Sequence, residues 1–295
     1  MKLQGTHTAL ATPFKDGAID EDALKRLVEF QIEEGIDGLI PCGSTGEAAT
    51  LSYEEHERVI ELTVKWARKR IPVIAGTGSN STKETIELTE IAKNLGADAA
   101  LVVAPYYNKP SQEGMYQHFK KVAEDVDLPL VLYNVPGRTG INMLPELVAR
   151  LSEVPNIVAI KEASGSVQQV ADIFKLTKGR FTILSGDDNL FLPMMTVGAT
   201  GVISVVSNIL PAKVKALGIA FLEEKDIEKA RNLHVELMPL FHGMFIETNP
   251  VPVKEALYFM DMIEKEVRLP LCGLAANNRD YLKGLLKDFG LLKRE

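Results

Sequence analysis

Cysteine is scarce in this chain of 295 residues, which contains only Cys42 and Cys272. The two residues lie far apart in the sequence, and neither belongs to a Cys-x-x-Cys pair. This excludes a disulfide framework and a thiolate zinc site as organising features. Two scattered thiols are typical of a protein from a reducing compartment, so we expect a cytoplasmic location.

Long apolar runs and clusters of positive charge are also missing. No stretch approaches the roughly 18 apolar residues of a membrane span, and residues 1–14 lack the sustained apolar core of a signal peptide. The formal net charge is −7, and Lys and Arg are dispersed along the chain. Such a surface has no basic patch for a phosphate backbone, so neither nucleic acid nor a membrane is an expected partner.

What the sequence does contain is a regular alternation of short β-branched runs with segments that carry apolar residues at helical spacing. Eight runs are expected as strands, within residues 7–14, 37–43, 71–78, 99–107, 129–136, 156–164, 181–188 and 201–208. Continuous apolar strands indicate a parallel sheet that is covered on both faces. Eight such units most simply close into a (β/α)₈ TIM barrel of the α/β class, with an open doubly wound sheet as the alternative fold.

The barrel does not account for the whole chain. Residues 226–241 and 251–266 follow the eighth expected strand and have a helical pattern. No low-complexity linker marks an independent second domain. We therefore expect one domain, with a barrel over residues 1–222 and a C-terminal helical extension over residues 223–295.

Lys161 stands at the end of the apolar sixth strand, and strand periodicity places it on the same face as Ile157 and Ala159. If that face points inward, the ammonium group enters the barrel mouth, where loss of water favours the neutral amine that attacks ketones. This interpretation makes Lys161 a Schiff-base lysine. The alternatives are a lysine that extends to solvent or one that pairs with Glu162.

Two further side chains are expected near the same rim, where barrel enzymes hold their active sites. Tyr133 lies at the end of the fifth strand and could transfer protons, or could be a core tyrosine with a satisfied hydroxyl. Arg138 lies just past the following turn and could clamp a carboxylate, or could be a solvated loop charge.

The segment Gly-Ser-Thr-Gly-Glu after the second strand offers the hydroxyls of Ser44 and Thr45 beside backbone N–H groups, which suits a carboxylate. The alternative is a helix-capping box formed by Ser44 and Glu47, and the same pattern recurs at Ser81 and Glu84.

Motifs for cofactors and metals are missing. The sequence has no dinucleotide fingerprint, no phosphate-binding loop and no His-Glu-x-x-His, and its five histidines are scattered. Asp187 and Asp188 could hold a cation, although a turn that enters a helix is the better interpretation. We therefore expect neither a metal nor an organic cofactor.

Six segments together, in this order and spacing, give a more specific indication: GSTGEAATLS, IPVIAGTGSN, PYYNKPSQEGMYQHF, LYNVPGRTG, IVAIKEASG and GVISV. Over essentially the whole chain they resemble the dihydrodipicolinate synthase and N-acetylneuraminate lyase superfamily, and most closely its synthase branch. The resemblance implies a lyase of the class I aldolase type that joins pyruvate to L-aspartate 4-semialdehyde. The product, 4-hydroxy-tetrahydrodipicolinate, belongs to the diaminopimelate route of lysine biosynthesis.

The resemblance also implies roles for individual residues. Lys161 would form a covalent imine with pyruvate, without a cofactor, and Tyr133 would relay protons through Thr45 to Tyr107 of a neighbouring subunit. The residues implied in substrate binding are Ser44, Thr45, Arg138, Gly186 and Ile203. Ser44 stands where many members have threonine, and Arg138 matches the arginine that holds the carboxylate of the aldehyde substrate.

Assembly and regulation are implied in the same way. Members are usually homotetramers built as dimers of tight dimers, with a lysine feedback site at the tight interface. The positions that match this site are Ala49, His56, Asn80, Glu84 and Tyr106. Tyr53 departs from the histidine found in some lysine-sensitive members. A sibling pyruvate-dependent aldolase for a sugar acid or another 2-oxo acid, and a non-catalytic metabolite sensor, are the alternatives in other functional classes.

Overall fold

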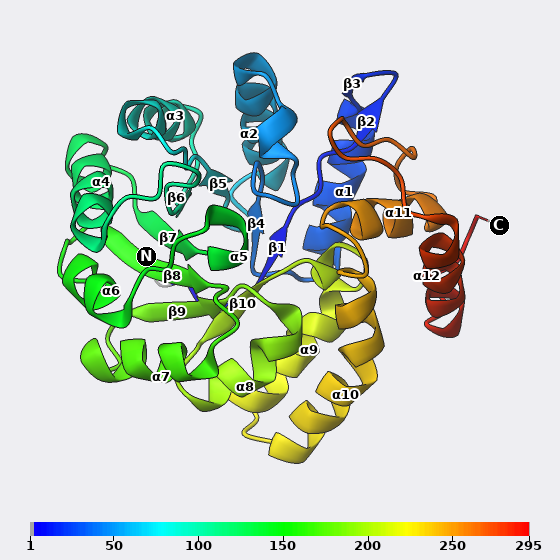
Figure 1. Cartoon of the computed structure of the whole chain (residues 1–295). Coiled ribbons are helices and arrows are strands. Elements are labelled where there is room, and N and C mark those ends of the chain that lie inside the picture. Colours follow the sequence, from blue (N-terminus) through cyan, green and yellow to red (C-terminus); the bar gives the residue numbers. More distant parts are fainter. Residues whose placement is uncertain (1–2, 295) are drawn as a thin grey trace.

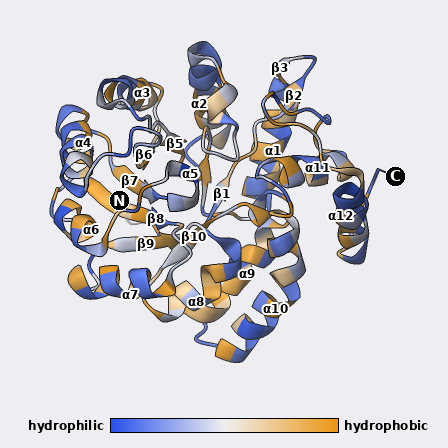
Figure 2. Cartoon of the chain, in the orientation of Figure 1, coloured by the Kyte–Doolittle hydropathy of each residue, from blue (hydrophilic) through white to orange (hydrophobic). Residues whose placement is uncertain are grey.

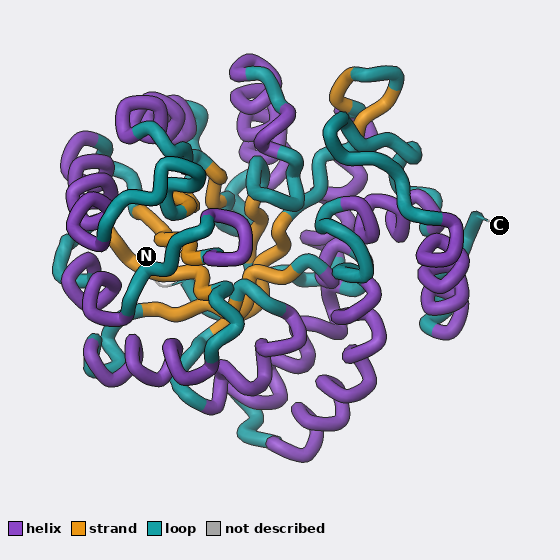
Figure 3. The backbone as a smooth tube through the Cα atoms, in the orientation of Figure 1, coloured by secondary structure: helices purple, strands orange, loops and turns teal. Residues whose placement is uncertain are grey.

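The computed structural model describes residues 3–294. The expected barrel range 1–222 and the expected extension range 223–295 therefore each begin or end just outside the described residues. Eight parallel strands form a ring with helices around it (Figure 1; Figure 3). The ring strands are β1 (Gly5–Ala9), β4 (Gly38–Ile40), β5 (Ile74–Gly76), β6 (Ala99–Val103), β7 (Leu130–Asn134), β8 (Ile157–Glu162), β9 (Thr182–Ser185) and β10 (Gly201–Ser204). The expected (β/α)₈ barrel is confirmed.

Each ring strand pairs with its neighbours in chain order, and a bridge between Leu39 and Val73 closes the ring between β4 and β5. One short hairpin was not predicted, formed by β2 (Phe14–Lys15) and β3 (Ala18–Ile19). These two strands have two residues each and leave no periodic pattern that a sequence could reveal.

The helices of the described chain form the outer layer and the extension. Their bounds are α1 (Glu21–Glu33), α2 (Tyr53–Ala67), α3 (Thr82–Asn94), α4 (Gln112–Asp125), α5 (Pro136–Thr139), α6 (Pro145–Leu151), α7 (Val167–Leu176), α8 (Phe191–Thr196), α9 (Pro211–Leu222), α10 (Ile227–Gly243), α11 (Val251–Phe259) and α12 (Ala276–Asp288). Three-residue 3₁₀ helices are η1 (Ala48–Thr50), η2 (Asp188–Leu190) and η3 (Val206–Asn208). Blue and orange alternate along the outer helices in Figure 2, as expected for helices with one buried face.

Two apolar clusters result from the strand periodicity. Val131, Tyr133 and Ala159 point into the barrel, where they join Leu184 and Ile203. The alternate residues of the same strands, among them Leu132 and Ile160, pack instead against the surrounding helices. Along each strand, side chains therefore point alternately into the barrel and toward the helices. Lys161 lies two positions after the inward-pointing Ala159, so it is on the inner face.

The extension comprises α10, α11 and α12, of which α12 had not been predicted. α10 packs against α9, and α12 packs against α10 and α11. α9 ends at Leu222 and α10 begins at Ile227. Because this turn coincides with the expected division, we propose the boundary between barrel and extension at residues 222 and 223. Within residues 3–294 no helix has the length and apolar character needed to cross a membrane.

Candidate active site

Lys161 lies inside the barrel mouth, with only 6% of its surface exposed. Its register partner on the adjacent strand is Tyr133, and the Lys161 Nζ atom is 4.3 Å from the centroid of the Tyr133 ring. The alternative in which Lys161 extends to solvent is wrong, because the side chain is buried. The structure therefore brings together the expected nucleophile and the expected proton carrier, as neighbours on one face of a strand pair.

Glu162 does not pair with Lys161. Its side chain lies on the opposite face of β8, where its carboxylate is hydrogen-bonded to other residues. It accepts hydrogen bonds from the Ser164 backbone N–H at 2.7 Å, from Asn134 Nδ2 at 3.1 and 3.2 Å, and from Gln169 Nε2 at 3.0 Å. Burial raises the pKa of the Glu162 carboxyl, although these donors favour its ionised form. The carboxylate ties the end of β8 to β7 and α7, directly behind Lys161.

A cavity of about 200 Å³ opens beside Tyr133. Its walls include Ser44, Tyr133 and Arg138, three of the residues expected to meet substrate. Ala49 and Tyr106 also line it. Lys161, Gly186 and Ile203 are not among its lining residues, although Ile203 shares the apolar cluster of Tyr133 inside the barrel.

Gly186 follows β9 and lies against the lysine. A methyl group built on its Cα would lie 2.5 Å from the Ala163 Cβ atom and 3.2 Å from the Lys161 Cε atom. A side chain at this position would therefore displace the lysine or its neighbour. The close approach explains why glycine stands between β9 and the two aspartates that follow.

Those aspartates form a turn into η2, as expected. The Asp188 carboxylate is buried and accepts hydrogen bonds from the backbone N–H groups of Val205 and Val206 at 2.9 and 3.0 Å. Burial raises the pKa of Asp187 to about 6, and the nearby Lys161 ammonium opposes this shift. Among residues 3–294 no group of three or more His, Cys, Asp or Glu side chains is arranged to hold a metal ion.

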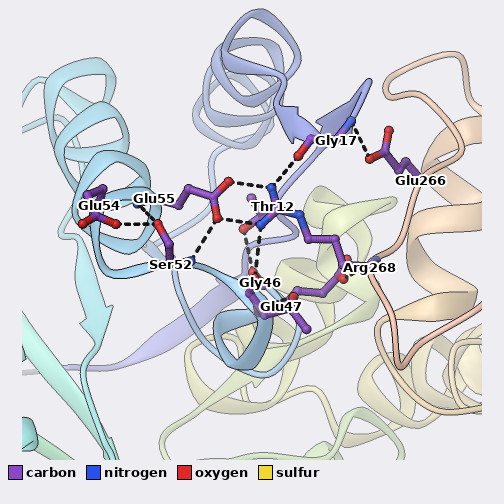
Figure 4. Close-up of polar contacts among 10 residues, drawn as sticks. Thr12, Gly17, Gly46, Glu47, Ser52, Glu54, Glu55, Glu266 and Arg268 are labelled. Carbon is purple, nitrogen blue, oxygen red and sulfur yellow. Dashed lines mark hydrogen bonds and ion pairs between the residues drawn. The ribbon is translucent and has the colours of Figure 1, made fainter.

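The loop that carries Ser44 and Thr45 is fixed by its last residue, Glu47. The Glu47 carboxylate forms an ion pair with Lys254 Nζ at 2.5 Å and accepts from the Arg268 backbone N–H at 3.0 Å. The alternative of a capping box formed by Ser44 and Glu47 is wrong, because this carboxylate is turned toward the extension. The complete capping box lies after η1, at Ser52 and Glu55, where α2 begins (Figure 4).

Both charges of this pair are buried, with exposed side-chain fractions of 0% for Glu47 and 2% for Lys254. Burial lowers the pKa of Lys254, and the Glu47 carboxylate opposes that change. Phe14 adds an aromatic face, whose centroid is 4.2 Å from Lys254 Nζ and 4.1 Å from Arg268 Cζ. Arg268 also binds the Glu55 carboxylate, so one cationic cluster of the extension holds the loop and the start of α2 (Figure 4).

Arg138 lies in the four-residue helix α5, where the sequence had indicated only a turn. Its Nη2 atom donates to the backbone carbonyl of Asn249 at 2.9 Å. The Asn249 side chain donates in turn from Nδ2 to Thr45 Oγ1 at 3.0 Å. Sequence reasoning had not selected Asn249, because it contacts both residues only after the extension has folded onto the barrel.

Tyr107 is not brought into the site of its own chain. It is 88% exposed and has a φ of 71°, a left-handed conformation that is uncommon for a bulky residue. The side chain therefore extends from the loop between β6 and α4 into the surroundings of the chain.

Several of the residues expected to bind L-lysine already have hydrogen-bond partners within the chain. The Glu84 carboxylate accepts hydrogen bonds from the Tyr53 hydroxyl and from Ser79 Oγ. Only half of the expected box at Ser81 is therefore present, because Ser81 caps α3 while the Glu84 side chain turns away. His56 is buried, with Nε2 at 2.8 Å from the Gly76 carbonyl oxygen, and Asn80 contributes its backbone carbonyl to Asn108 Nδ2 at 2.9 Å.

Comparison with known proteins gives consistent results. The family model described as the dihydrodipicolinate synthetase family matches residues 2–289. The chain is 57% identical over 290 residues to the 4-hydroxy-tetrahydrodipicolinate synthase of Geotalea uraniireducens (strain Rf4), covering 98% of this chain and 100% of that one. The solved dihydrodipicolinate synthase of Aquifex aeolicus has a TM-score of 0.97 and 50% identity, and covers 99% of this chain and 100% of its own.

A second solved structure adds a ligand. The chloride-inhibited dihydrodipicolinate synthase of Acinetobacter baumannii, complexed with pyruvate, has a TM-score of 0.96 and 48% identity. The match covers 99% of this chain and 100% of that one.

The ion pair of Glu47 and Lys254 predicts an asymmetric stability effect. Glu47→Gln or Lys254→Met alone should lower the free energy of unfolding by about 3–5 kcal/mol, because each leaves one buried charge without its partner. The double variant should recover part of this loss. Urea unfolding measures the effect. Lys229→Met, which removes a largely exposed ion pair with Glu224, is the control and should change stability by less than about 1 kcal/mol. A similarly small change for Lys254→Met would contradict the prediction.

Proposed function

The chain belongs to the dihydrodipicolinate synthetase family, and from this premise we propose how its own residues perform the family reaction. The chain catalyses the 4-hydroxy-tetrahydrodipicolinate synthase reaction, a condensation of pyruvate with L-aspartate 4-semialdehyde through a lysine imine that needs no cofactor. The observation that carries the assignment of roles is the burial of Lys161 beside Tyr133 at the mouth of the barrel.

Lys161 attacks the ketone carbon of pyruvate through Nζ. Water leaves, and a carbon–nitrogen double bond links the lysine to the former ketone carbon. Loss of a proton from the methyl carbon then gives an enamine, whose carbon forms a bond to the aldehyde carbon of the second substrate. The amino group of the adduct displaces Lys161 and closes the ring.

Tyr133 is the central proton carrier in this proposal. It lies over the lysine, and its hydroxyl gives and receives protons as the carbinolamine collapses and the enamine forms. Thr45 passes the proton on, toward Tyr107 of a neighbouring subunit. The support for a role in a neighbour is the exposure of Tyr107, which extends away from its own site.

The pyruvate carboxylate is bound by the loop after β4, through the hydroxyls of Ser44 and Thr45. Gly186 allows pyruvate to approach Lys161, since a larger residue would fill that space. Ile203 offers backbone groups at the end of β10. The buried ion pair of Glu47 supports this arrangement because it holds the loop rigidly from behind.

Arg138 holds the carboxylate of L-aspartate 4-semialdehyde. Arg138 and Tyr133 both line the cavity, and the bond to the Asn249 carbonyl uses one of the five N–H donors of the guanidinium. The remaining donors can bind a carboxylate in the bidentate geometry that a neutral sugar hydroxyl does not match.

We further propose a homotetramer built as a dimer of tight dimers, the assembly that the family resemblance implies, in which the relay through Tyr107 draws on a second chain. The cytoplasm is the proposed location, because its reducing conditions keep the exposed thiol of Cys272 free.

L-Lysine is the proposed effector, held at the tight interface by residues that include Glu84, His56 and Tyr106, with Ala49 and Asn80 beside them. Glu84 would pair with the lysine ammonium group. The Tyr53 hydroxyl already occupies this carboxylate, so the effector must compete with it and the feedback is weak.

Lys161 and Tyr107 can be tested together. Lys161→Ala should abolish turnover without unfolding the chain, and borohydride with pyruvate should label only the protein that retains Lys161. Tyr107→Phe should slow turnover by about a hundredfold. When the two variants are dissociated, mixed and reassembled, activity should exceed that of either alone, because one site then has both residues intact.

Two results would contradict this proposal. If the Lys161→Ala variant turned over substrate at the wild-type rate, the imine mechanism would be wrong. Mixed assemblies whose activity equals only the sum of the two variants would show that Tyr107 does not act across subunits.

Arg138→Ala should raise the KM for the semialdehyde about 10- to 100-fold, the effect of losing a hydrogen bond to a charged group. The KM for pyruvate and the borohydride labelling should stay unchanged. Initial rates with N-acetylmannosamine and glyceraldehyde as competing acceptors measure specificity. Arg150→Ala is the control, since Arg150 pairs with Glu113 on the surface. An unaltered preference for the semialdehyde in Arg138→Ala would exclude the clamp.

Tyr53→Phe should strengthen inhibition by L-lysine several-fold, because it releases the Glu84 carboxylate. Initial rates at subsaturating pyruvate, with lysine up to millimolar concentration, measure this, and Tyr281→Phe on α12 serves as the control. If L-lysine changed the initial rate of neither the wild type nor Tyr53→Phe, the effector site would be excluded.

A further inference from the structure

The loop between β6 and α4, residues 104–111, carries Tyr106 and Tyr107 in different directions. Tyr106 lines the cavity of its own chain, whereas Tyr107 is 88% exposed and extends away from that chain. A sharp turn of the backbone separates the two rings. The contacts that hold this turn in place decide where the Tyr107 hydroxyl lies.

The turn is a γ-turn centred on Tyr107. The Asn108 backbone N–H donates to the Tyr106 carbonyl at 2.8 Å, and the φ of Tyr107 is 71°. A bond between residues two positions apart, with a positive φ at the central residue, defines the form of γ-turn that is rare and strained. Because a bulky residue seldom adopts this conformation, contacts outside the turn must maintain it.

The side chain of Asn108 provides such a contact. Its Nδ2 atom donates to the Asn80 backbone carbonyl at 2.9 Å, which links the loop to the segment between β5 and α3. Within the described residues 3–294, residues 105–110 make only two hydrogen bonds, and Asn108 donates both. The conformation of Tyr107 therefore depends on hydrogen bonds from the residue that follows it.

The carbonyl that accepts this bond is itself fixed. On one side of Asn80, the Ser79 backbone N–H donates to Thr85 Oγ1 at 3.1 Å. On the other side, the Ser81 carbonyl accepts from the same hydroxyl at 2.9 Å. Thr85 lies on α3 and is fully buried. The Asn108 amide therefore connects the Tyr107 turn to a rigid part of the barrel.

We propose that Asn108 is a positioning residue that holds the Tyr107 hydroxyl where the active site of a neighbouring subunit can use it. The proposal rests on the proposed function, in which Tyr107 serves the site of another chain. Asn108 does not line the cavity of its own chain, so its effect reaches the reaction through Tyr107. An exposed tyrosine that is held in one direction has less freedom to lose when it acts, which favours the reaction.

Asn108→Ala should lower kcat about tenfold, because Tyr107 then relaxes toward a negative φ and its hydroxyl leaves the required position. The KM for pyruvate and the borohydride labelling of Lys161 should stay at wild-type values, since the cavity of the same chain keeps its residues. Initial rates with both substrates measure kcat and KM. Asn232→Ala, on the exposed surface of α10, is the control and should have wild-type kcat.

Asn108→Asp keeps the shape of the side chain and provides a second variant in case Asn108→Ala does not fold. An ionised carboxylate only accepts hydrogen bonds, so it repels the Asn80 carbonyl instead of binding it. The value of kcat should again fall about tenfold. Asn232→Asp makes the same change of charge elsewhere and should turn over at the wild-type rate.

Assemblies mixed from two variants show on which chain's site Asn108 acts. When Asn108→Ala and Lys161→Ala chains are dissociated, mixed and reassembled, the intact lysine lies only in the Asn108→Ala chain. Its Lys161→Ala neighbour then supplies a Tyr107 that an intact Asn108 holds. The rate per intact Lys161 should therefore rise toward the wild-type rate. An unchanged rate per lysine would overturn the proposal, because Asn108 would then act on the site of its own chain.

A double-mutant cycle tests whether Asn108 acts through Tyr107. In a Tyr107→Phe background, Asn108→Ala should cause no further loss of kcat, because the hydroxyl to be held is absent. An equal loss in both backgrounds would overturn the proposal, as would wild-type kcat in Asn108→Asp. A parallel loss of kcat and of labelling would also overturn it, because that result indicates only a structural role.

Failure of the proposed function gives different results. Wild-type protein would then not be labelled at Lys161 by pyruvate and borohydride, or mixtures of Lys161→Ala with Tyr107→Phe would show only their summed activity. If the wild type is labelled and that mixture exceeds the sum, normal kcat in both Asn108 variants would remove only the role of Asn108.

Discussion

The buried ion pair between Glu47 and Lys254 is the constraint on which the rest of the active site depends. Neither charge can be hydrated, since both side chains are almost fully covered, and a single buried charge is strongly unfavourable. The loop after β4 and helix α11 must therefore dock together or not at all. Phe14 and Arg268 complete the same cluster. The extension thus holds the loop of Ser44 and Thr45 from behind.

Strand periodicity provides a second constraint that acts without long-range contacts. Tyr133 and Lys161 are register partners on one face of β7 and β8, while Asn134 and Glu162 are register partners on the other. The inner pair carries the proposed chemistry. The outer pair is hydrogen-bonded and fixes the strand ends. Because the two faces share one backbone, the buried Glu162 network limits how far Lys161 can move relative to Tyr133.

These two constraints explain what the sequence could and could not predict. The barrel and the inward direction of Lys161 follow from local patterns, namely short apolar strands of period two with helices between them. The surroundings of Glu47 do not follow, because its partner Lys254 is 207 positions away. Local reasoning could offer Glu47 only a capping box as an alternative role, which is a short-range motif. Asn249 was missed for the same reason, since its contact with Thr45 spans 204 positions.

The arrangement around Asn249 also bears on how specificity can change within this site. Arg138, the proposed clamp for the second substrate, is bonded to the backbone of Asn249, and Thr45, the proposed relay, is bonded to its side chain. A larger or differently charged acceptor that moved Arg138 would pull on the same residue that donates to the Thr45 hydroxyl. The loop after β4 and the helix that carries Arg138 are therefore linked through a single residue of the extension. An acceptor that displaced Arg138 would have to break or replace its bond to the Asn249 carbonyl.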